Sequence, residues 1–335
     1  MIMHGLISQA HRQIRPSQLI HISSRLRHGG SPLLAKRYKK KVKTTYAITR
    51  EIPDSFINAV VQHHSSPDDE NNAVSLIKAR SQHNEYVKQL RRHVPRVLTL
   101  PPLETHPDCL FVEDAVVAVG SKVVITQMGH LSRRGEVDSI KEALLDRIEG
   151  MSHIYDMRED ENALCDGGDV MYTGRHLFVG QSNRTNTAGF EFLRDAFTNE
   201  DVFQNDLEVK DIISVPPVVA GKEVLHLKSA ITHLDEHTIL APEGKIGDDV
   251  LEAMNAKELG YESIRLPDVL SCNVVVANGH VLVQDSNCKV SRKRIKEACK
   301  ERGLGLTFVD TSELAKKDGA LTCCSVLLQF DIYTY

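Results

Sequence analysis

The sequence lacks several features that mark particular classes of protein. No stretch approaches about eighteen consecutive apolar residues, so no membrane-spanning helix is indicated. The seven cysteines include no CxxC pair and no zinc-finger spacing. Because their number is also odd, they fit a reducing compartment better than a disulfide framework. A cysteine that matters in this chain is therefore expected to matter through its reactivity.

The first fifty residues contain no Asp or Glu. They hold eleven Lys and Arg, whereas the whole chain of 335 residues has a formal net charge of −4. A basic, serine-containing, acid-free segment is typical of a mitochondrial transit peptide, and this one lacks the apolar core of a secretory signal. A disordered tail is the alternative, and the run Lys36–Lys43 also fits a nuclear-targeting or polyanion-binding patch. We expect a leader over 1–43, a single domain over 44–335, and a mitochondrial or cytoplasmic location.

One structural unit recurs beyond residue 45. An alternating two-strand run with a tight turn precedes a helical pattern four times, and these runs lie at 114–126, 169–180, 229–241 and 273–284. A fifth helix is predicted over about 72–93, after an isolated strand at 46–50. The missing partner of that strand is expected in the C-terminal strand at 324–330. Five strand-and-helix units predict an α/β fold of repeats.

Polar residues interrupt the apolar strands at the same place in each unit. These residues are Glu113, Asp114, Asp166, Asp169, His226, Asn273 and Cys323. Each has an ordinary structural interpretation when taken alone, since a strand cysteine is usually part of a core and "CDGGD" is usually a turn. In a radial array, however, equivalent strand positions converge on one axis. Their common position therefore predicts a cluster of carboxylates, a histidine and a thiol.

Two adjacent cysteines open the predicted C-terminal strand. Neighbouring strand residues point to opposite faces, so Cys323 and Cys324 are not expected to share a role. A thiol close to a protonated histidine has a lowered pKa, which makes covalent catalysis the predicted chemistry. The surplus of carboxylates would repel an oxyanion. A cationic substrate fits better, and a guanidinium suits carboxylates because its planar fork of N–H groups pairs with them bidentately.

Six separated motifs between residues 46 and 327 carry a resemblance to a known family. "DCLFVEDAVVAV", "SRRGE", "DGGDV", "VGQSNRTN", "VLHLKS" and "VDTSELAKKDGALTCCS" resemble, in order, the dimethylarginine dimethylaminohydrolases of the guanidino-modifying superfamily. The resemblance implies the pentein fold, a five-bladed α/β propeller of ββαβ units with the active site on its pseudo-fivefold axis. It also implies that 44–335 is a catalytic domain.

The resemblance further implies an activity. Asymmetric dimethylarginine and monomethylarginine would be hydrolysed to citrulline and dimethylamine or methylamine. The reaction would pass through a covalent thiouronium on cysteine and would need no metal or organic cofactor. The implied partner is a small methylarginine, with no nucleic acid or membrane, and the chain is expected to be a monomer or homodimer.

Positions that match the motifs imply roles for individual residues. Cys323 resembles the family's nucleophile, His226 its general acid and base, and Asp166 the carboxylate that orients the histidine. The implied substrate contacts are Glu113 and Asp114 to the guanidinium, Asp108 to the α-amino group, Arg133 and Arg184 to the α-carboxylate, Phe111 in the pocket wall, and the main-chain carbonyls of Val61 and Lys317. Gln127 stands where relatives often have Arg, which puts in question a contact near Arg133.

Two other functions fit parts of the same pattern. An arginine or agmatine deiminase would use the same nucleophile, histidine and carboxylates. Agmatine has no carboxylate for Arg133 and Arg184 to bind, so it is disfavoured as a substrate. Arginine is harder to exclude, because the volume of the pocket, and not a motif, decides whether the methyl groups of a methylated arginine are accepted. A non-catalytic protein of the same fold, for interaction or redox sensing, is the alternative from another class. The presence of every implied catalytic residue argues against it.

Overall fold

The computed structural model describes residues 20–21, 42–61, 73–151, 153–198, 209–217 and 226–332. Most of the predicted leader at 1–43 therefore lies outside the described residues. No helix within the described ranges combines the length and apolar character needed to cross a membrane.

The described residues form an α/β fold in which one sheet pattern recurs. Each of five sheets has an antiparallel strand pair, and a third strand joins in parallel after a helix. The predicted two-strand runs and helices are present. Four of the units follow one another along the chain, each with a strand pair, a helix and a third strand in that order. The first two units are β4 (Val116–Val119), β5 (Lys122–Ile125), α2 (Val137–Arg147) and β6 (His153–Asp156), and then β7 (Val170–Tyr172), β8 (His176–Gly180), α3 (Thr187–Thr198) and β9 (Asp211–Val215). The next two are β10 (Thr232–Asp235), β11 (Thr238–Pro242), α5 (Lys245–Ala253) and β12 (Glu262–Leu266), and then β13 (Val274–Ala277), β14 (His280–Gln284), α6 (Lys289–Glu301) and β15 (Gly305–Val309).

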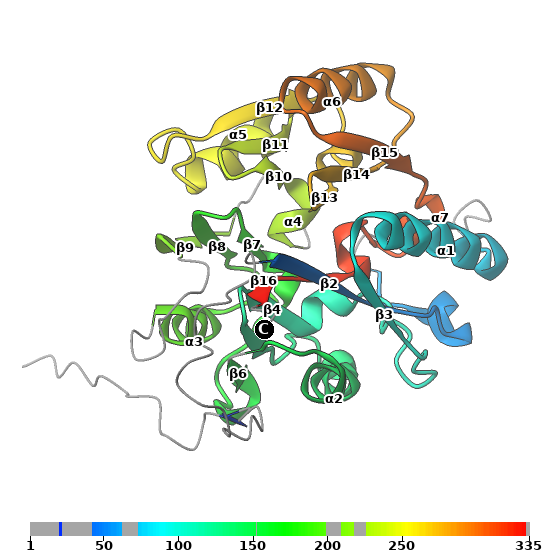
Figure 1. Ribbon diagram of the computed structural model, residues 1–335, viewed down its shortest axis with the longest axis vertical. Coiled ribbons are helices and arrows are strands. Elements are labelled where there is room, and N and C mark those ends of the chain that lie inside the picture. Colours follow the sequence, from blue (N-terminus) through cyan, green and yellow to red (C-terminus); the bar gives the residue numbers. More distant parts are fainter. Residues whose placement is uncertain are drawn as a thin grey trace, which may run out of the picture.

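The fifth sheet joins the two ends of the chain. The C-terminal strand β16 (Val326–Ile332) pairs antiparallel with β2 (Val42–Arg50), as predicted, and β3 (Arg96–Leu100) pairs parallel with β2 after α1 (Leu76–His93). The register runs from Val326 opposite Ile48 to Ile332 opposite Val42. A short strand β1 (Ile20–His21) adds antiparallel to β6. Figure 1 shows β2, β4 and β16 together at the centre of the view, with the long helices farther out.

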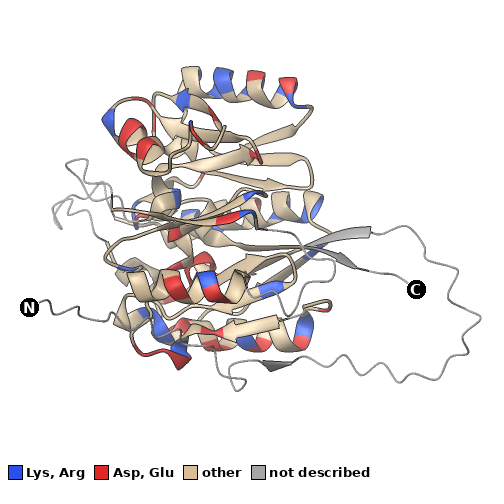
Figure 2. Ribbon diagram, turned by 90° about the vertical axis from the view of Figure 1, so that its left-hand side faces the viewer, with Lys and Arg blue, Asp and Glu red and all other residues tan. Residues whose placement is uncertain are grey.

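Local sequence explains several of these elements. Asn278 and Gly279 both have positive φ angles, 48° and 79°, as a tight two-residue hairpin turn between β13 and β14 requires. Ser75 caps α1 by accepting a hydrogen bond from the Lys78 N–H (3.4 Å). Charged residues of both signs lie mostly on the outer helices and loops, and the strands between carry few (Figure 2).

Short helical turns, not strands, carry most of the predicted cluster. Each of these turns lies just before an edge strand of a sheet; they are η5 (Val112–Ala115), η8 (Gly167–Asp169), η10 (Leu270–Cys272), η11 (Thr322–Cys324) and the one-turn helix α4 (Leu227–Ala230). Contacts join η5 to η8 and η11, and α4 to η8 and η10. The placement of Cys323 and Cys324 in a strand was therefore wrong, because both belong to η11. The fold nevertheless gathers these turns at one place.

Candidate active site

A cavity of about 30 Å³ lies where these turns meet. It takes its walls from segments that are far apart in the sequence. The lining residues are Val60, Asp108, Phe111, Asp114, Arg133, Asp166, Arg184, His226, Lys317, Asp318, Gly319 and Cys323. All the residues to which the resemblance gives a catalytic or substrate-binding role are among them except Glu113 and Val61, whereas Asp169 and Asn273 of the predicted cluster do not line the cavity. Val60, the neighbour of Val61, lines the cavity instead, and its N–H donates to both oxygens of Asp108 (3.1 and 3.3 Å).

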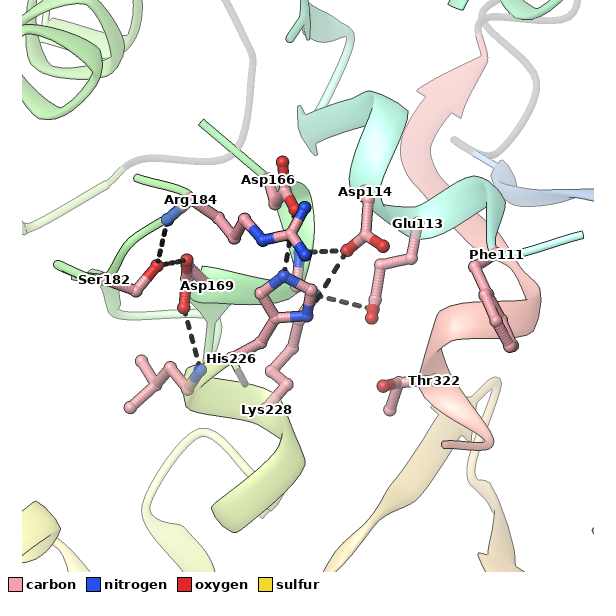
Figure 3. A network of polar contacts seen from close by, with 12 residues as sticks. Phe111, Glu113, Asp114, Asp166, Asp169, Ser182, Arg184, His226, Lys228 and Thr322 are labelled. Carbon is pink, nitrogen blue, oxygen red and sulfur yellow. Dashed lines mark hydrogen bonds and ion pairs between the residues drawn. The ribbon is translucent and has the colours of Figure 1, made fainter. Parts of the chain in front are cut away.

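His226 is held between two buried carboxylates. Its Nε2 lies 3.0 Å from Asp166 Oδ2, within hydrogen-bonding distance, and its Nδ1 lies 3.8 Å from Asp114 Oδ1 (Figure 3). Asp166 is itself fixed, because its Oδ1 accepts from the Gly129 N–H (2.9 Å). A Cβ on Gly168 would come within 2.7 Å of both Asp114 Oδ1 and His226 Nδ1. Glycine at this position therefore lets the carboxylate and the imidazole approach each other.

The surrounding carboxylates favour the protonated form of His226. Burial alone would lower the pKa of the imidazole, but Asp114, the hydrogen bond to Asp166 and the charge of Asp169 outweigh it and raise the pKa to about 9. The side chain is 4% exposed, and its Nδ1 is buried without a hydrogen-bond partner among the described residues. The imidazole is thus a buried acid with one free ring nitrogen.

Arg133 lies inside a buried ion-pair network. Its Nη1 donates to Asp114 Oδ2 (2.6 Å), and its Nε and Nη2 donate to the carboxylate of Glu136. The Nη2 group also donates to the backbone carbonyl of Phe111 (3.1 Å). Burial opposes the charge of Arg133, but Glu136 and Asp114 raise its pKa well above the ordinary value. Most of its N–H groups are therefore committed within the protein, although the guanidinium reaches the cavity wall.

Glu113 faces a second cavity. It lines a space of about 180 Å³, shared with Lys228 and with residues of β4, β7, β10, β13 and β16. Its Oε1 accepts from the Lys228 ammonium (2.6 Å), while its Oε2 is buried without a partner among the described residues. Burial, partly offset by Lys228, raises the pKa of this carboxyl. Lys228 was not predicted for the site. Its position two residues after His226 in the "HLKS" motif was the available signal.

The two adjacent cysteines have separate environments. Cys323 lines the small cavity and is 7% exposed. Cys324 is fully buried in the apolar core, and its Sγ donates to the Ala320 carbonyl (3.6 Å). Burial raises the pKa of the Cys323 thiol far above its ordinary value, and the nearby charges of Glu113 and Asp114 raise it further. This corrects the expectation that a neighbouring histidine lowers the pKa of this thiol in the substrate-free protein.

The remaining predicted residues surround the cavity. Phe111 packs edge-on against Phe56, with ring centroids 6.0 Å apart, and a Cβ on Gly319 would come within 2.5 Å of its ring. Arg184 is only partly buried, in a loop whose Ser182 Oγ accepts from the Arg184 N–H (3.0 Å). Burial raises the pKa of the Asp108 carboxyl. The cavity thus has carboxylates and the thiol together with a more accessible guanidinium.

Two other residues support the walls of the site. The Gln127 amide donates to the carbonyls of Asp160, Glu161 and Ala163, so this side chain fixes the loop before Asp166. Asn273, which the sequence placed in the cluster, donates to the Lys228 carbonyl (2.9 Å) and accepts from the Thr322 N–H (2.9 Å). Asn273 therefore holds the turn that carries Cys323.

One group of described residues has the spacing of a metal site. Asp114, Asp166 and His226 offer ligand atoms that all lie within 4.8 Å of one another. The guanidinium of Arg133 contacts Asp114 at 2.6 Å and would repel a cation there, while the Asp166 carboxylate is engaged by His226. These contacts fit a charged hydrogen-bond network better than a metal centre.

Comparison with known proteins assigns the chain to a family. A family model described as eukaryotic N,N dimethylarginine dimethylhydrolase matches residues 53–266. The N(G),N(G)-dimethylarginine dimethylaminohydrolase of Streptomyces coelicolor is 30% identical over 251 residues, which cover 75% of this chain and 86% of that protein. The chain belongs to the dimethylarginine dimethylaminohydrolase family. It is accordingly a hydrolase of guanidino C–N bonds.

Solved structures agree with this family assignment. The dimethylarginine dimethylaminohydrolase of Pseudomonas aeruginosa, in a cysteine-to-serine variant complexed with citrulline, has a TM-score of 0.69 and 26% identity, covering 85% of this chain and 98% of that one. The N-terminal domain of a cyanobacterial arginine dihydrolase has a TM-score of 0.63 at 20% identity, covering 85% of this chain and 97% of that one. The second likeness shows a shared α/β fold only.

Proposed function

We propose that this member of the dimethylarginine dimethylaminohydrolase family hydrolyses Nω-methylated arginines. Asymmetric dimethylarginine and monomethylarginine would give citrulline with dimethylamine or methylamine. The observation that carries the proposal is the shared cavity: the Cys323 thiol and the His226 imidazole line it together with the carboxylates of Asp108 and Asp114 and with Arg184. A substrate for this cavity combines a cationic group with a carboxylate.

One buried polar atom supports the same substrate. Glu113 Oε2 has no hydrogen-bond partner among the described residues, and an unsatisfied buried acceptor is costly. A guanidinium would supply N–H donors to Asp114, which lines the small cavity, and to Glu113, the residue before it in η5, although Glu113 itself lines the second cavity. In this proposal Asp108 receives the α-amino group, the partly buried Arg184 binds the α-carboxylate, and Phe111 with the carbonyls near Val60 and Lys317 forms the remaining wall.

The proposed first step is attack by Cys323. The thiol is neutral in the free protein because burial and two carboxylates raise its pKa. A bound guanidinium would offset those negative charges, so the thiol would release its proton to solvent when substrate binds. The thiolate then forms a bond to the guanidinium carbon, and a tetrahedral species results.

His226 is the proposed acid and then the base. Protonated in the resting protein, it would give a proton from Nδ1 to the methylated nitrogen, so that the C–N bond breaks and the amine leaves. A thiouronium on Cys323 remains. The neutral His226 would take a proton from a water molecule that attacks the same carbon. When the second tetrahedral species collapses, its hydroxyl proton passes to the departing sulfur, so citrulline and the neutral Cys323 thiol are released. Asp166 holds the imidazole throughout.

Relatives support this chemistry. The Pseudomonas aeruginosa enzyme has been crystallised with citrulline, and a dimethylarginine dimethylaminohydrolase has been crystallised as an adduct with S-methyl-L-thiocitrulline. Citrulline is the product proposed here, and S-methyl-L-thiocitrulline resembles the proposed substrate, with sulfur replacing the methylated nitrogen. At 26% and 25% identity, these structures make the same ligands sensible probes for this chain.

We also propose that the five sheets are the blades of one propeller. The cavity of about 180 Å³ takes lining residues from one edge strand of every sheet, namely β4, β7, β10, β13 and β16. Strands around one space are what a radial array requires. The active site would then lie at one end of the central axis, formed by the turns that precede these strands.

The leader remains a separate proposal. Residues 1–43 are basic and acid-free, which supports mitochondrial targeting with a cytoplasmic form as the alternative. A fluorescent protein fused behind residues 1–43 should be imported, and diffuse fluorescence would contradict targeting. The catalytic domain at 44–335 is proposed as a monomer or homodimer, and light scattering of the purified protein would distinguish these states.

Product analysis tests the proposed function. We expect purified protein to release citrulline with dimethylamine from asymmetric dimethylarginine and citrulline with methylamine from monomethylarginine. Ammonia from arginine, with neither methylated substrate consumed, would instead indicate an arginine deiminase. No turnover of any of the three, with the thiols shown to be reduced, would contradict catalysis and favour the non-catalytic alternative.

A further inference from the structure

Asp169 is a buried carboxylate that the proposed reaction does not use. It is 1% exposed, and it accepts hydrogen bonds from three groups: the Leu227 N–H (3.0 Å), the Ser182 hydroxyl (2.6 Å) and the Thr185 hydroxyl (2.7 Å). Burial raises the pKa of this carboxyl, while His226 and these donors oppose the rise. Burying a carboxylate that only neutral donors contact costs free energy of folding, which suggests that Asp169 has a role beyond packing.

The first two contacts join opposite sides of the cavity. Leu227 follows His226 directly, so Asp169 Oδ1 fixes the backbone that carries the proposed acid. Asp169 Oδ2 holds Ser182, whose hydroxyl oxygen accepts from the N–H groups of Arg184 (3.0 Å) and Thr185 (3.2 Å). The same carboxylate therefore fixes the loop that carries the proposed α-carboxylate contact. Figure 3 shows Asp169 between Ser182 and the start of α4.

The third contact reaches the residue that orients the histidine. The Thr185 hydroxyl donates to Asp169, and its oxygen accepts from the Asp166 N–H (3.1 Å). Gly180 lets Leu227 and Asp169 lie close to its backbone, since a Cβ at this position would lie 3.0 Å from Leu227 Cβ and 3.4 Å from Asp169 Oδ1. Asp169 thus contacts, directly or through one hydroxyl, the segments that bear Arg184, Asp166 and His226.

We infer that Asp169 is a positioning residue that couples the binding site for the substrate's α-carboxylate to the acid–base histidine. The inference rests on the proposed function, since it assigns Arg184 and His226 their proposed roles. It adds that one charge sets both the geometry of the Arg184 loop and the protonation of His226. Asp169 acts through these residues and does not contact the substrate.

The charges around His226 define what an Asp169 variant must show. Asp114 acts on it from η5, Asp166 from the residue before η8 and Asp169 from η8, and Lys228 lies in α4, which His226 directly precedes. Arg133, Arg184 and the Cys323 thiol share the cavity with it. In Asp169→Asn the side chain keeps an oxygen for the Leu227 N–H but loses one of the negative charges that favour the imidazolium. The pKa of His226 should therefore fall.

The test compares Asp169→Asn with Ser182→Ala. NMR titration of the substrate-free proteins should show the pKa of His226 falling by about one pH unit in Asp169→Asn, while Ser182→Ala leaves it unchanged. The KM for asymmetric dimethylarginine should rise about tenfold in both variants, because both release the Arg184 loop. The alkaline limb of the kcat profile should move to lower pH in Asp169→Asn alone. If Asp169 had only a structural role, Asp169→Asn would lower activity without shifting the alkaline limb of its kcat profile.

The outcomes separate the inference from the proposed function. An unchanged pKa of His226 in folded Asp169→Asn, or an equal change in Ser182→Ala, would overturn the inference whether or not the wild type turns over methylarginine. Absence of wild-type turnover with a selective fall in that pKa would instead overturn only the proposed function. If Asp169→Asn fails to fold, Thr185→Val should raise KM and Thr185→Ser should restore it, and equal KM values for that pair would contradict the coupling.

Discussion

Single residues of the same type have different tasks in this site. The sequence suggested Arg133 and Arg184 as an equivalent clamp on the α-carboxylate. In the structure Arg133 is buried with Asp114 and Glu136, whereas Arg184 is partly buried and lines the cavity from a loop. Their pairing partners, which lie in different segments, could not be read from the motifs "SRRGE" and "SNRTN".

Substitution of each arginine should therefore give a different result. Arg184→Ala should raise the KM for asymmetric dimethylarginine about 10- to 100-fold with a smaller change in kcat, since it removes a binding contact. Arg133→Ala leaves two buried carboxylates unpaired, so it should lower the free energy of unfolding by about 3–5 kcal/mol and reduce kcat. Steady-state kinetics and urea unfolding measure both. An unchanged stability in Arg133→Ala would contradict its role as an internal partner.

The raised pKa of His226 should make the stability of the folded protein depend on pH. Folding raises this pKa from its ordinary value of 6.5 to about 9. A group whose pKa is raised on folding binds its proton more tightly in the folded state, so its contribution is complete below pH 6.5 and is lost as pH rises through about 9. Urea unfolding from pH 6 to 10 should show wild type losing stability over this window relative to His226→Asn. Parallel curves for the two proteins would contradict the account.

Most elements were predictable from the sequence, and the exceptions have a physical cause. The hairpins and helices followed their periodicities. The third strands β3, β9 and β15 did not, because each grades from an exposed first residue to a buried last residue instead of alternating. The turns before the inner strands were also missed. There Cys323 and Cys324 still point to different surroundings, but a helical turn and not strand alternation separates them.

Gly168 in the turn η8 is a position where the structure predicts the effect of a single substitution. Alanine at Gly168 would place a Cβ 2.7 Å from both Asp114 Oδ1 and His226 Nδ1, so one of these side chains must move. Gly168→Ala should lower kcat/KM about 100-fold, because small displacements of catalytic groups are costly. Gly279→Ala is the control: its φ of 79° is unfavourable for alanine, but no atom lies within 4 Å of the new Cβ. It should lose about 1 kcal/mol of stability and keep full activity.

At the scale of the whole molecule, the site depends on the pairing of the chain ends. Cys323 precedes β16, which pairs with β2 over seven residue pairs. The sequence predicted this pairing because the strand at 46–50 had no partner of its own. The convergence of the five turns was predicted only from their common position in the repeat. Their distances, and the separation of Glu113 from the small cavity, depend on packing between sheets.

Substitution of Leu328 tests how much the pairing of β16 with β2 contributes to the stability of the fold. Leu328 is fully buried and pairs with Tyr46 across the two strands. Leu328→Ala should lower the free energy of unfolding by about 2–5 kcal/mol, since it removes buried apolar surface and leaves a cavity. Ile77→Ala is the matched control, because Ile77 is 85% exposed. Equal urea midpoints for the two variants would contradict a stabilising role for the pairing.

Cys323, and not its neighbour Cys324, is the residue that we propose attacks the substrate. The most direct measurement is citrulline release from asymmetric dimethylarginine by wild type, Cys323→Ser and Cys324→Ser. We predict that Cys323→Ser loses at least about 1,000-fold in kcat, because serine cannot replace the thiolate. Cys324→Ser should retain activity within about tenfold, since its side chain is buried in the core. Citrulline release that persists in Cys323→Ser, or is lost only in Cys324→Ser, would contradict the account.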